Sequence, residues 1–177
     1  MAQFVAFLRG MNLGNRRITN DALRAAFARI GFADVVTFRA SGNVIFTADD
    51  DEAAVTNRVE EGLSEHLGYE VPTFVRSAAE LEAMAAYQPF PAEQVEASNG
   101  KLQVGMLLRK PTAAKRKAVL AMATDEDPLE LHERELYWLP SGGLLESDLD
   151  LDAIDKLIGP TTRRTKGTVE QLAKKLG

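Results

Sequence analysis

Apolar and polar residues alternate in short blocks along the first half of the chain, and each block matches the period of a strand or a helix. Residues 3–9 are apolar on both faces, which is typical of a central strand. The blocks that follow predict a helix over 19–30, strands over 35–40 and 44–47, a helix over 49–67 and a strand over 69–75. This order, β-α-β-β-α-β, is that of the ferredoxin-like plait.

The second half repeats the pattern in part. After a short helix over 78–86, a segment rich in proline and polar residues over 87–100 predicts a linker. The elements expected beyond it are a strand over 101–108, a helix over 111–122, a hairpin over 129–132 and 135–139, and helices over 146–158 and 168–176. No strand pattern stands at 159–167, so the last strand of a second plait is expected to be missing or irregular.

We therefore predict an α+β protein of tandem ferredoxin-like units, with antiparallel sheets, helices on one face and an irregular second unit. The first subdomain spans 1–86, the linker 87–100 and the second subdomain, which ends in a helix, 101–177.

The plait places two distant segments at the same end of the first sheet. Its strands lie in the order 4-1-3-2, and a right-handed crossover makes strands 1 and 2 parallel. The end of strand 1 at Arg9-Gly10 then lies near the turn after strand 2, which includes Ser41 and Gly42. The first helix begins at the same end, near Thr19.

This end of the sheet combines the groups that bind anions. Glycines let backbone N–H groups approach a ligand, arginines donate paired hydrogen bonds, and a helix N-terminus carries positive partial charge. We expect Arg9, Arg16 and Arg39 to neutralise charge, Gly10, Gly14 and Gly42 to admit backbone contacts, and Asn12, Ser41 and Asn43 to orient the ligand. The predicted ligand is small and bears a phosphate or a carboxylate.

A structural interpretation stands beside this one. Gly10 and Gly14 permit tight turns, and Asn43 can close a hairpin with its side chain. The chain would then be a protein- or nucleic-acid-interaction module. Nucleic acid is the less favoured partner, because residues 43–47 hold one aromatic side chain and no arginine, unlike an RNA-recognition strand.

Charge is distributed unevenly along the 177 residues. The first 48 residues hold six Lys/Arg against two Asp/Glu, residues 160–177 hold five against one, and the net charge of the chain is −5. A basic head and a basic tail permit a local anion site if they meet in space. The chain has no cysteine and no run near the ~20 apolar residues of a membrane span, so we expect a cytoplasmic protein without a membrane partner.

Motifs that suggest a metal site or a catalytic site are incomplete in this sequence. Asp148, Asp150 and Asp152 have the spacing of a calcium loop, but alanine and glycine stand where glycine and glutamate are required. The two histidines lie in the acidic middle of the chain, away from Ser41. No catalytic residue, metal ligand or cofactor motif is identified, and whether the chain is an enzyme stays open.

Two motifs resemble a known family. FLRGMNLG at 7–14 and FRASGNVIF at 38–46 are similar to the L-R-G-[IMV]-N-[LV]-G and S-G-N-[VI]-x-F segments of the uncharacterised bacterial family called domain of unknown function 1697. The resemblance implies a bacterial protein of two plait-like subdomains and supplies no activity. Its motif positions here are Arg9, Gly10, Asn12, Gly14, Ser41, Gly42 and Asn43.

The family also has a T-x-R-N-W-x-T-V segment before its last helix. Residues 162–169 occupy this place, where Arg164, Thr168 and Val169 keep the pattern. Thr165 and Lys166 replace the Asn and the Trp. Arg164 is accordingly a further, weaker candidate for ligand binding.

Overall fold

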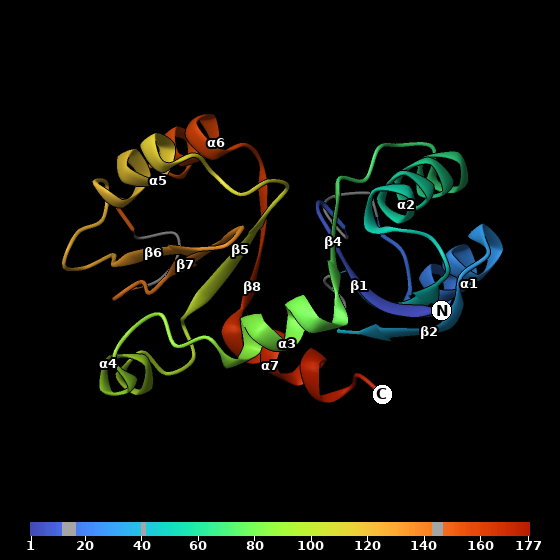
Figure 1. Cartoon of the computed structure of the whole chain (residues 1–177), viewed down its shortest axis with the longest axis horizontal. Helices are drawn as coiled ribbons and strands as arrows, with labels where there is room; N and C mark the ends of the chain where they lie inside the picture. The colour runs from blue at the N-terminus through green and yellow to red at the C-terminus, as the bar shows by residue number, and fades with distance from the viewer. Residues whose placement is uncertain (12–16, 40–41, 143–146) are drawn as a thin grey trace. The chain divides into compact units, whose positions relative to one another are not determined.

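The computed structural model describes residues 1–11, 17–39, 42–142 and 147–177 (Figure 1). They divide into two compact units: unit 1 comprises Met1–Glu82 with Leu172–Gly177, and unit 2 comprises Ala83–Gln171. Among these residues, no helix combines the length and the apolar character that crossing a membrane requires.

Unit 1 has the predicted plait. Its elements are β1 (Ala2–Leu8), α1 (Asn20–Ile30), β2 (Ala33–Phe38), β3 (Asn43–Ala48), α2 (Glu52–Leu67) and β4 (Thr73–Ser77), and α3 (Ala78–Ala86) follows β4 directly. The sheet order β2-β3-β1-β4, with antiparallel neighbours, confirms the predicted 4-1-3-2 arrangement. β4 is an edge strand, as Pro72 immediately before it indicates.

The helices of unit 1 begin and end where local chemistry dictates. Thr19 caps α1 by accepting a hydrogen bond from the Ala22 N–H, and Gly31 ends it in the left-handed conformation with φ +112°. α1 and α2 pack their apolar faces on one side of the sheet (Figure 1). Phe27 of α1 and Phe46 of β3 meet in this core, with ring centroids 5.4 Å apart.

Unit 2 repeats this order of elements. It contains α4 (Ala92–Ala97), β5 (Gln103–Leu107), α5 (Ala113–Leu120), β6 (Leu129–His132), β7 (Glu135–Trp138), α6 (Leu151–Ile158), β8 (Thr161–Thr165) and most of α7 (Lys166–Lys174). The sheet order β6-β7-β5-β8 is that of unit 1. α4 lies within the segment predicted as a linker.

The expectation that 159–167 lacks a strand is wrong. β8 pairs antiparallel with β5, with Thr161 opposite Leu107 and Thr165 opposite Gln103. The alternation that marks a strand is present, but the buried positions are Thr162 and Arg164 and not apolar residues. A hydrophobicity pattern therefore could not identify it, although β-branched threonine suits a strand.

The two sheets also match in detail at one end. The N–H of Leu8, the last residue of β1, donates to the Gly42 carbonyl at 2.9 Å. Likewise, the N–H of Leu107 at the end of β5 donates to the Arg134 carbonyl at 2.9 Å. By the same register, β3 and β7 each begin with a buried polar residue, Asn43 and Glu135.

Candidate functional site

The two motif segments of unit 1 meet at the end of β1. The hydrogen bond from Leu8 to Gly42 joins them directly. Gly42 has φ +79°, and a Cβ atom there would lie 2.9 Å from Met11 Cγ and 3.0 Å from Leu8 Cβ. Only glycine fits this position without displacing its neighbours, so the turn lies tightly against the strand end. We call this region, formed by residues 8–11, 38, 39, 42 and 43, the motif rim.

Asn43 closes the hairpin between β2 and β3. Its side chain is fully buried, and Nδ2 donates to the Phe38 carbonyl at 2.9 Å. A buried amide in this geometry holds the turn together, because both groups would otherwise lose their hydrogen bonds to water. This contact matches the structural interpretation of Asn43.

Arg9 and Gly10 lie on the exposed side of the motif rim. The Arg9 N–H donates to the Pro72 carbonyl at 3.0 Å, which holds the backbone, while the residue is exposed. Gly10 has φ +76°, and no heavy atom of the described residues would lie within 4 Å of an added Cβ. Among these residues, only the backbone conformation calls for glycine at this position.

The basic head and the basic tail meet at Phe38. The Arg39 guanidinium carbon and Lys175 Nζ each lie 5.1 Å from the centroid of this ring. Both cations are within the range of cation–π attraction. Sequence reasoning did not name Lys175, although the charge distribution indicated that a basic tail could reach this site. Arg39 itself adopts the left-handed conformation, with φ +58°.

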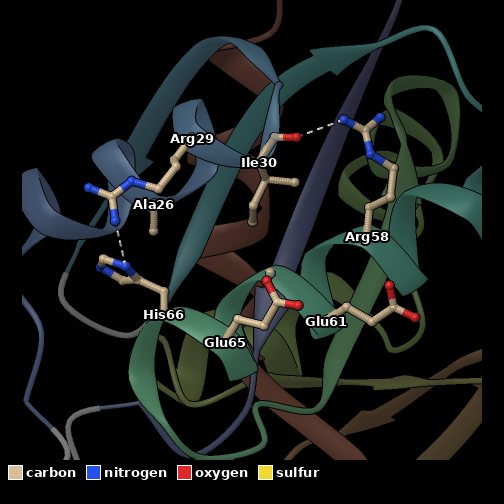
Figure 2. A pocket seen from close by; sticks show the side chains of 8 residues that line it. Ala26, Arg29, Ile30, Arg58, Glu61, Glu65 and His66 are labelled. Carbon is tan, nitrogen blue, oxygen red and sulfur yellow. Dashed lines mark hydrogen bonds between the residues drawn. The ribbon is translucent and has the colours of Figure 1, made fainter.

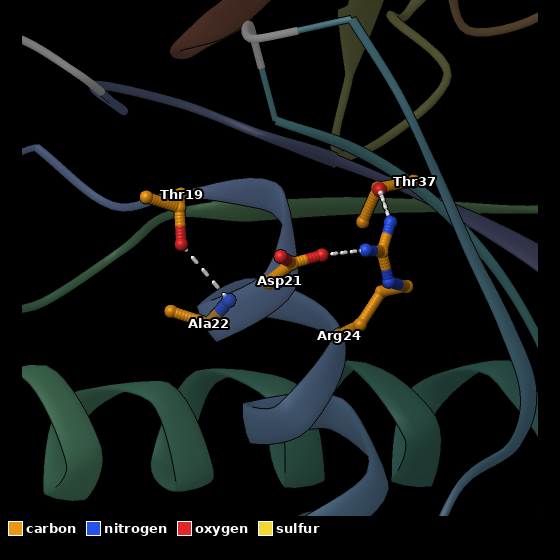
Figure 3. A network of polar contacts seen from close by, with 5 residues as sticks. All are labelled: Thr19, Asp21, Ala22, Arg24 and Thr37. Atoms are coloured by element: carbon orange, nitrogen blue, oxygen red, sulfur yellow. Dashed lines mark hydrogen bonds and ion pairs between the residues drawn. The ribbon is translucent and has the colours of Figure 1, made fainter.

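A polar network links the start of α1 to β2 (Figure 3). Arg24 forms an ion pair with Asp21 and donates to Thr37 Oγ1 at 2.8 Å. The acid in the first turn of α1 thus has its own cationic partner. Its charge is offset within the network, which leaves the helix N-terminus with less negative charge than the sequence indicates.

Four of the predicted site residues lie outside the described residues: Asn12, Gly14, Arg16 and Ser41. The structure brings Gly42 and Asn43 together with the end of β1, and Arg39 lies at the end of β2 beside Phe38.

Arg164 belongs to unit 2, in β8. It is 8% exposed, and Nη1 donates to Thr162 Oγ1 and to the Arg163 carbonyl, both at 2.8 Å. Burial lowers the pKa of Arg164 to about 10, because removal from water disfavours its charge. These contacts orient the guanidinium along its own strand.

The replaced family positions beside Arg164 have a structural role. Thr165 Oγ1 accepts a hydrogen bond from the Thr168 N–H at 3.2 Å and so caps α7. Asparagine and threonine both favour this position, which accounts for the exchange. Ser77 caps α3 in the same way after β4, accepting from the Glu80 N–H at 3.2 Å.

A cavity of about 560 Å³ lies between α1 and α2 (Figure 2). Its cationic side chains have partners within the unit. Arg29 Nη1 lies 3.1 Å from His66 Nδ1, and Arg58 Nη2 donates to the Ile30 carbonyl at 2.9 Å. Arg58 also pairs with Asp50. Glu61 and Glu65 also line the cavity, so it mixes acidic and basic side chains, which does not favour an anion.

No metal centre is present in the described part of the chain, where no three His, Asp or Glu side chains are grouped to hold an ion.

Comparisons with known proteins give a family and a fold. A family model described as "Protein of unknown function (DUF1697)" matches residues 1–137. No curated protein is significantly similar in sequence. Among solved structures, the conserved bacterial protein SP0830 from Streptococcus pneumoniae is similar over 99% of both chains, with a TM-score of 0.74 and 17% identity. At that identity the likeness shows the fold alone. The family model covers well over half of the sequence, so the chain belongs to the DUF1697 family of proteins of unknown function.

Proposed function

We propose that the motif rim of unit 1 binds a small ligand bearing a phosphate or a carboxylate. The observation that carries this proposal is the hydrogen bond between Leu8 and Gly42, which joins the two family motifs into one rim. No heavy atom of the described residues fills the space beside Gly10 at that rim.

The electrostatics support an anionic ligand. Arg9, Arg39 and Lys175 are exposed, and they come from three separate segments of unit 1. Arg39 and Lys175 gather on one aromatic ring, which places two positive charges close together. A bound anion would reduce their repulsion and accept charge-assisted hydrogen bonds from them.

Thermal unfolding with a ligand panel tests the proposal. The panel holds inorganic phosphate, pyrophosphate, a nucleoside monophosphate and citrate, in a buffer without other multivalent anions. A ligand at about a hundred times its Kd stabilises the native state by about 2.7 kcal/mol, which is readily seen as a rise in Tm. Native mass spectrometry of freshly purified protein complements the panel by detecting a ligand that remains bound.

Variants then locate the site. Arg9→Ala and Lys175→Ala should each weaken the response, since the first removes a charge of the rim and the second removes a charge beside it at Phe38. Lys174→Ala is the matched control, because Lys174 is also exposed and is adjacent in sequence, while the cation–π contact with Phe38 is made by Lys175. A panel without any shift, or a shift that Arg9→Ala leaves intact, contradicts the proposal. Oligonucleotide binding that falls steeply with salt would favour the interaction module instead.

A further inference from the structure

A cavity of about 420 Å³ lies in unit 2 where β5 leads into α5. It is lined by residues 108–112, by Lys115 and by residues 158–160. Three of these nine residues are cations, Arg109, Lys110 and Lys115, and none is an acid. A hollow whose described lining holds three positive side chains and no negative one has the charge of an anion site.

The positive charges are poorly compensated within the described residues. Lys110 Nζ is 3.6 Å from Glu133 Oε2, but the two side chains are 68% and 62% exposed, so solvent screens this ion pair. Lys115 stands in the first turn of α5, where the helix dipole disfavours a cation. Thr112 caps the helix and accepts from the Lys115 N–H at 3.2 Å, which holds Lys115 at the cavity.

The rest of the lining is apolar. Leu108 is 48% exposed, an unusual exposure for a large apolar side chain in this protein, and Pro111, Ile158 and Pro160 lie on the same cavity. An apolar wall beside a cationic cluster suits a ligand with an anionic group and a compact apolar body.

We propose that this cavity binds the phosphate monoester of a small apolar molecule. Arg109, Lys110 and Lys115 contact the phosphate, and Leu108, Ile158 and Pro160 contact the apolar body. The site stands on residues of unit 2 alone and does not depend on the function proposed for the motif rim.

The test uses the full-length protein and three probes: 1-naphthyl phosphate, inorganic phosphate and 1-naphthol. The phosphate monoester should raise Tm by roughly 5–10 °C at about a hundred times its Kd. Inorganic phosphate should have a smaller effect at equal concentration, and naphthol should have none. Arg109→Ala and Lys115→Ala should each raise the Kd of the monoester about tenfold or more. Isothermal titration calorimetry measures this change.

Three further variants distinguish ligand binding at this site from a general change in stability and from binding at the motif rim. Lys115→Glu should raise Tm without a ligand, because an acid suits the first turn of a helix, yet it should abolish the response to the monoester. Lys156→Ala, which removes an exposed cation of α6 outside the cavity lining, and Arg9→Ala should leave that response unchanged.

The proposal is overturned if no probe shifts Tm, or if naphthol binds as tightly as its phosphate. It also fails if Lys115→Glu retains the response, or if Arg9→Ala removes it.

Discussion

The two units share one fold, but the turns that meet the ends of β1 and β5 differ in their residues. In unit 1 the Leu8 N–H meets the carbonyl of Gly42, and in unit 2 the Leu107 N–H meets the carbonyl of Arg134. Glycine lets the first turn lie tightly against its strand, whereas Arg134 extends a side chain whose Nη1 is 3.4 Å from the Leu108 carbonyl.

The segments after the strands differ as well. In unit 1, residues 9–19 separate β1 from α1, while in unit 2 residues 108–112 suffice between β5 and α5. The long segment carries the family motif, and the short one supplies two of the three cations around a cavity, with Lys115 of α5 as the third. The two units therefore have the same strand register, and they differ in the residues of the segments that follow the strands.

The largest expected effect on this comparison comes from Gly42→Ala. Alanine at this position would have to adopt the left-handed backbone conformation. Its methyl group would also lie only 2.9–3.3 Å from atoms of Met11 and Leu8. We expect the free energy of unfolding to fall by about 3 kcal/mol, from backbone strain and overpacking together. Chemical denaturation with urea measures it.

Gly10→Ala is the matched control for that substitution. Gly10 has nearly the same backbone conformation, φ +76°, but open space around an added Cβ. Gly10→Ala should lower the free energy of unfolding by about 1 kcal/mol, because only the backbone conformation is strained. Equal losses for the two variants would show that the close packing of the turn on β1 does not matter.

Asn43→Ala tests whether the SGN turn serves structure. It removes the buried hydrogen bond to the Phe38 carbonyl, and we expect a loss of about 2 kcal/mol in the free energy of unfolding. Asn57→Ala, at an exposed asparagine of α2, should change it by less than about 0.5 kcal/mol. If Asn43→Ala also abolishes anion binding by folded protein, the amide has a role beyond closing the hairpin.

The smallest expected effect concerns the residue after the last strand of each unit. Lys166 begins α7 after β8, where Ala78 begins α3 after β4. Lys166 Nζ donates to the Ala85 carbonyl at 2.9 Å, and burial lowers the pKa of this amine below its usual 10.5. Between the folded and the unfolded pKa the unfolded chain binds more protons, so this group makes the free energy of unfolding rise with pH.

Lys166→Met should therefore remove that contribution. The difference in free energy of unfolding between variant and wild type should shift in favour of wild type as pH rises from the lowered pKa of the folded state toward the pKa of the unfolded lysine. Urea denaturation at a series of pH values measures this slope, and Lys174→Met serves as the exposed control. A difference that is constant over the whole range would contradict the assigned pKa shift.

Much of unit 1 was predictable because its elements have local signals. As expected, α1 begins after the N-cap residue Thr19 and ends at Gly31. Pro72 correctly predicted that β4 is an edge strand. Topology then placed the turn at Gly42 beside the end of β1, which the structure confirms.

The missed features of unit 2 lack such signals. β8 buries Thr162 and Arg164, so apolar alternation could not reveal it. The cavity near Lys115 depends on residues 158–160 returning to the start of α5, a contact between segments more than forty residues apart. No local pattern encodes a contact of that range.

The sequence by itself determined the order of elements, the helix caps and the two glycine-containing motifs of the family, because each depends on residues near one another in the chain. Only the tertiary structure decided that β8 completes the second sheet, that Lys175 joins Arg39 at Phe38, and that three cations share a cavity. The physical reason is that these features arise from packing between distant segments, where strand pairing and burial override the local preference of each residue.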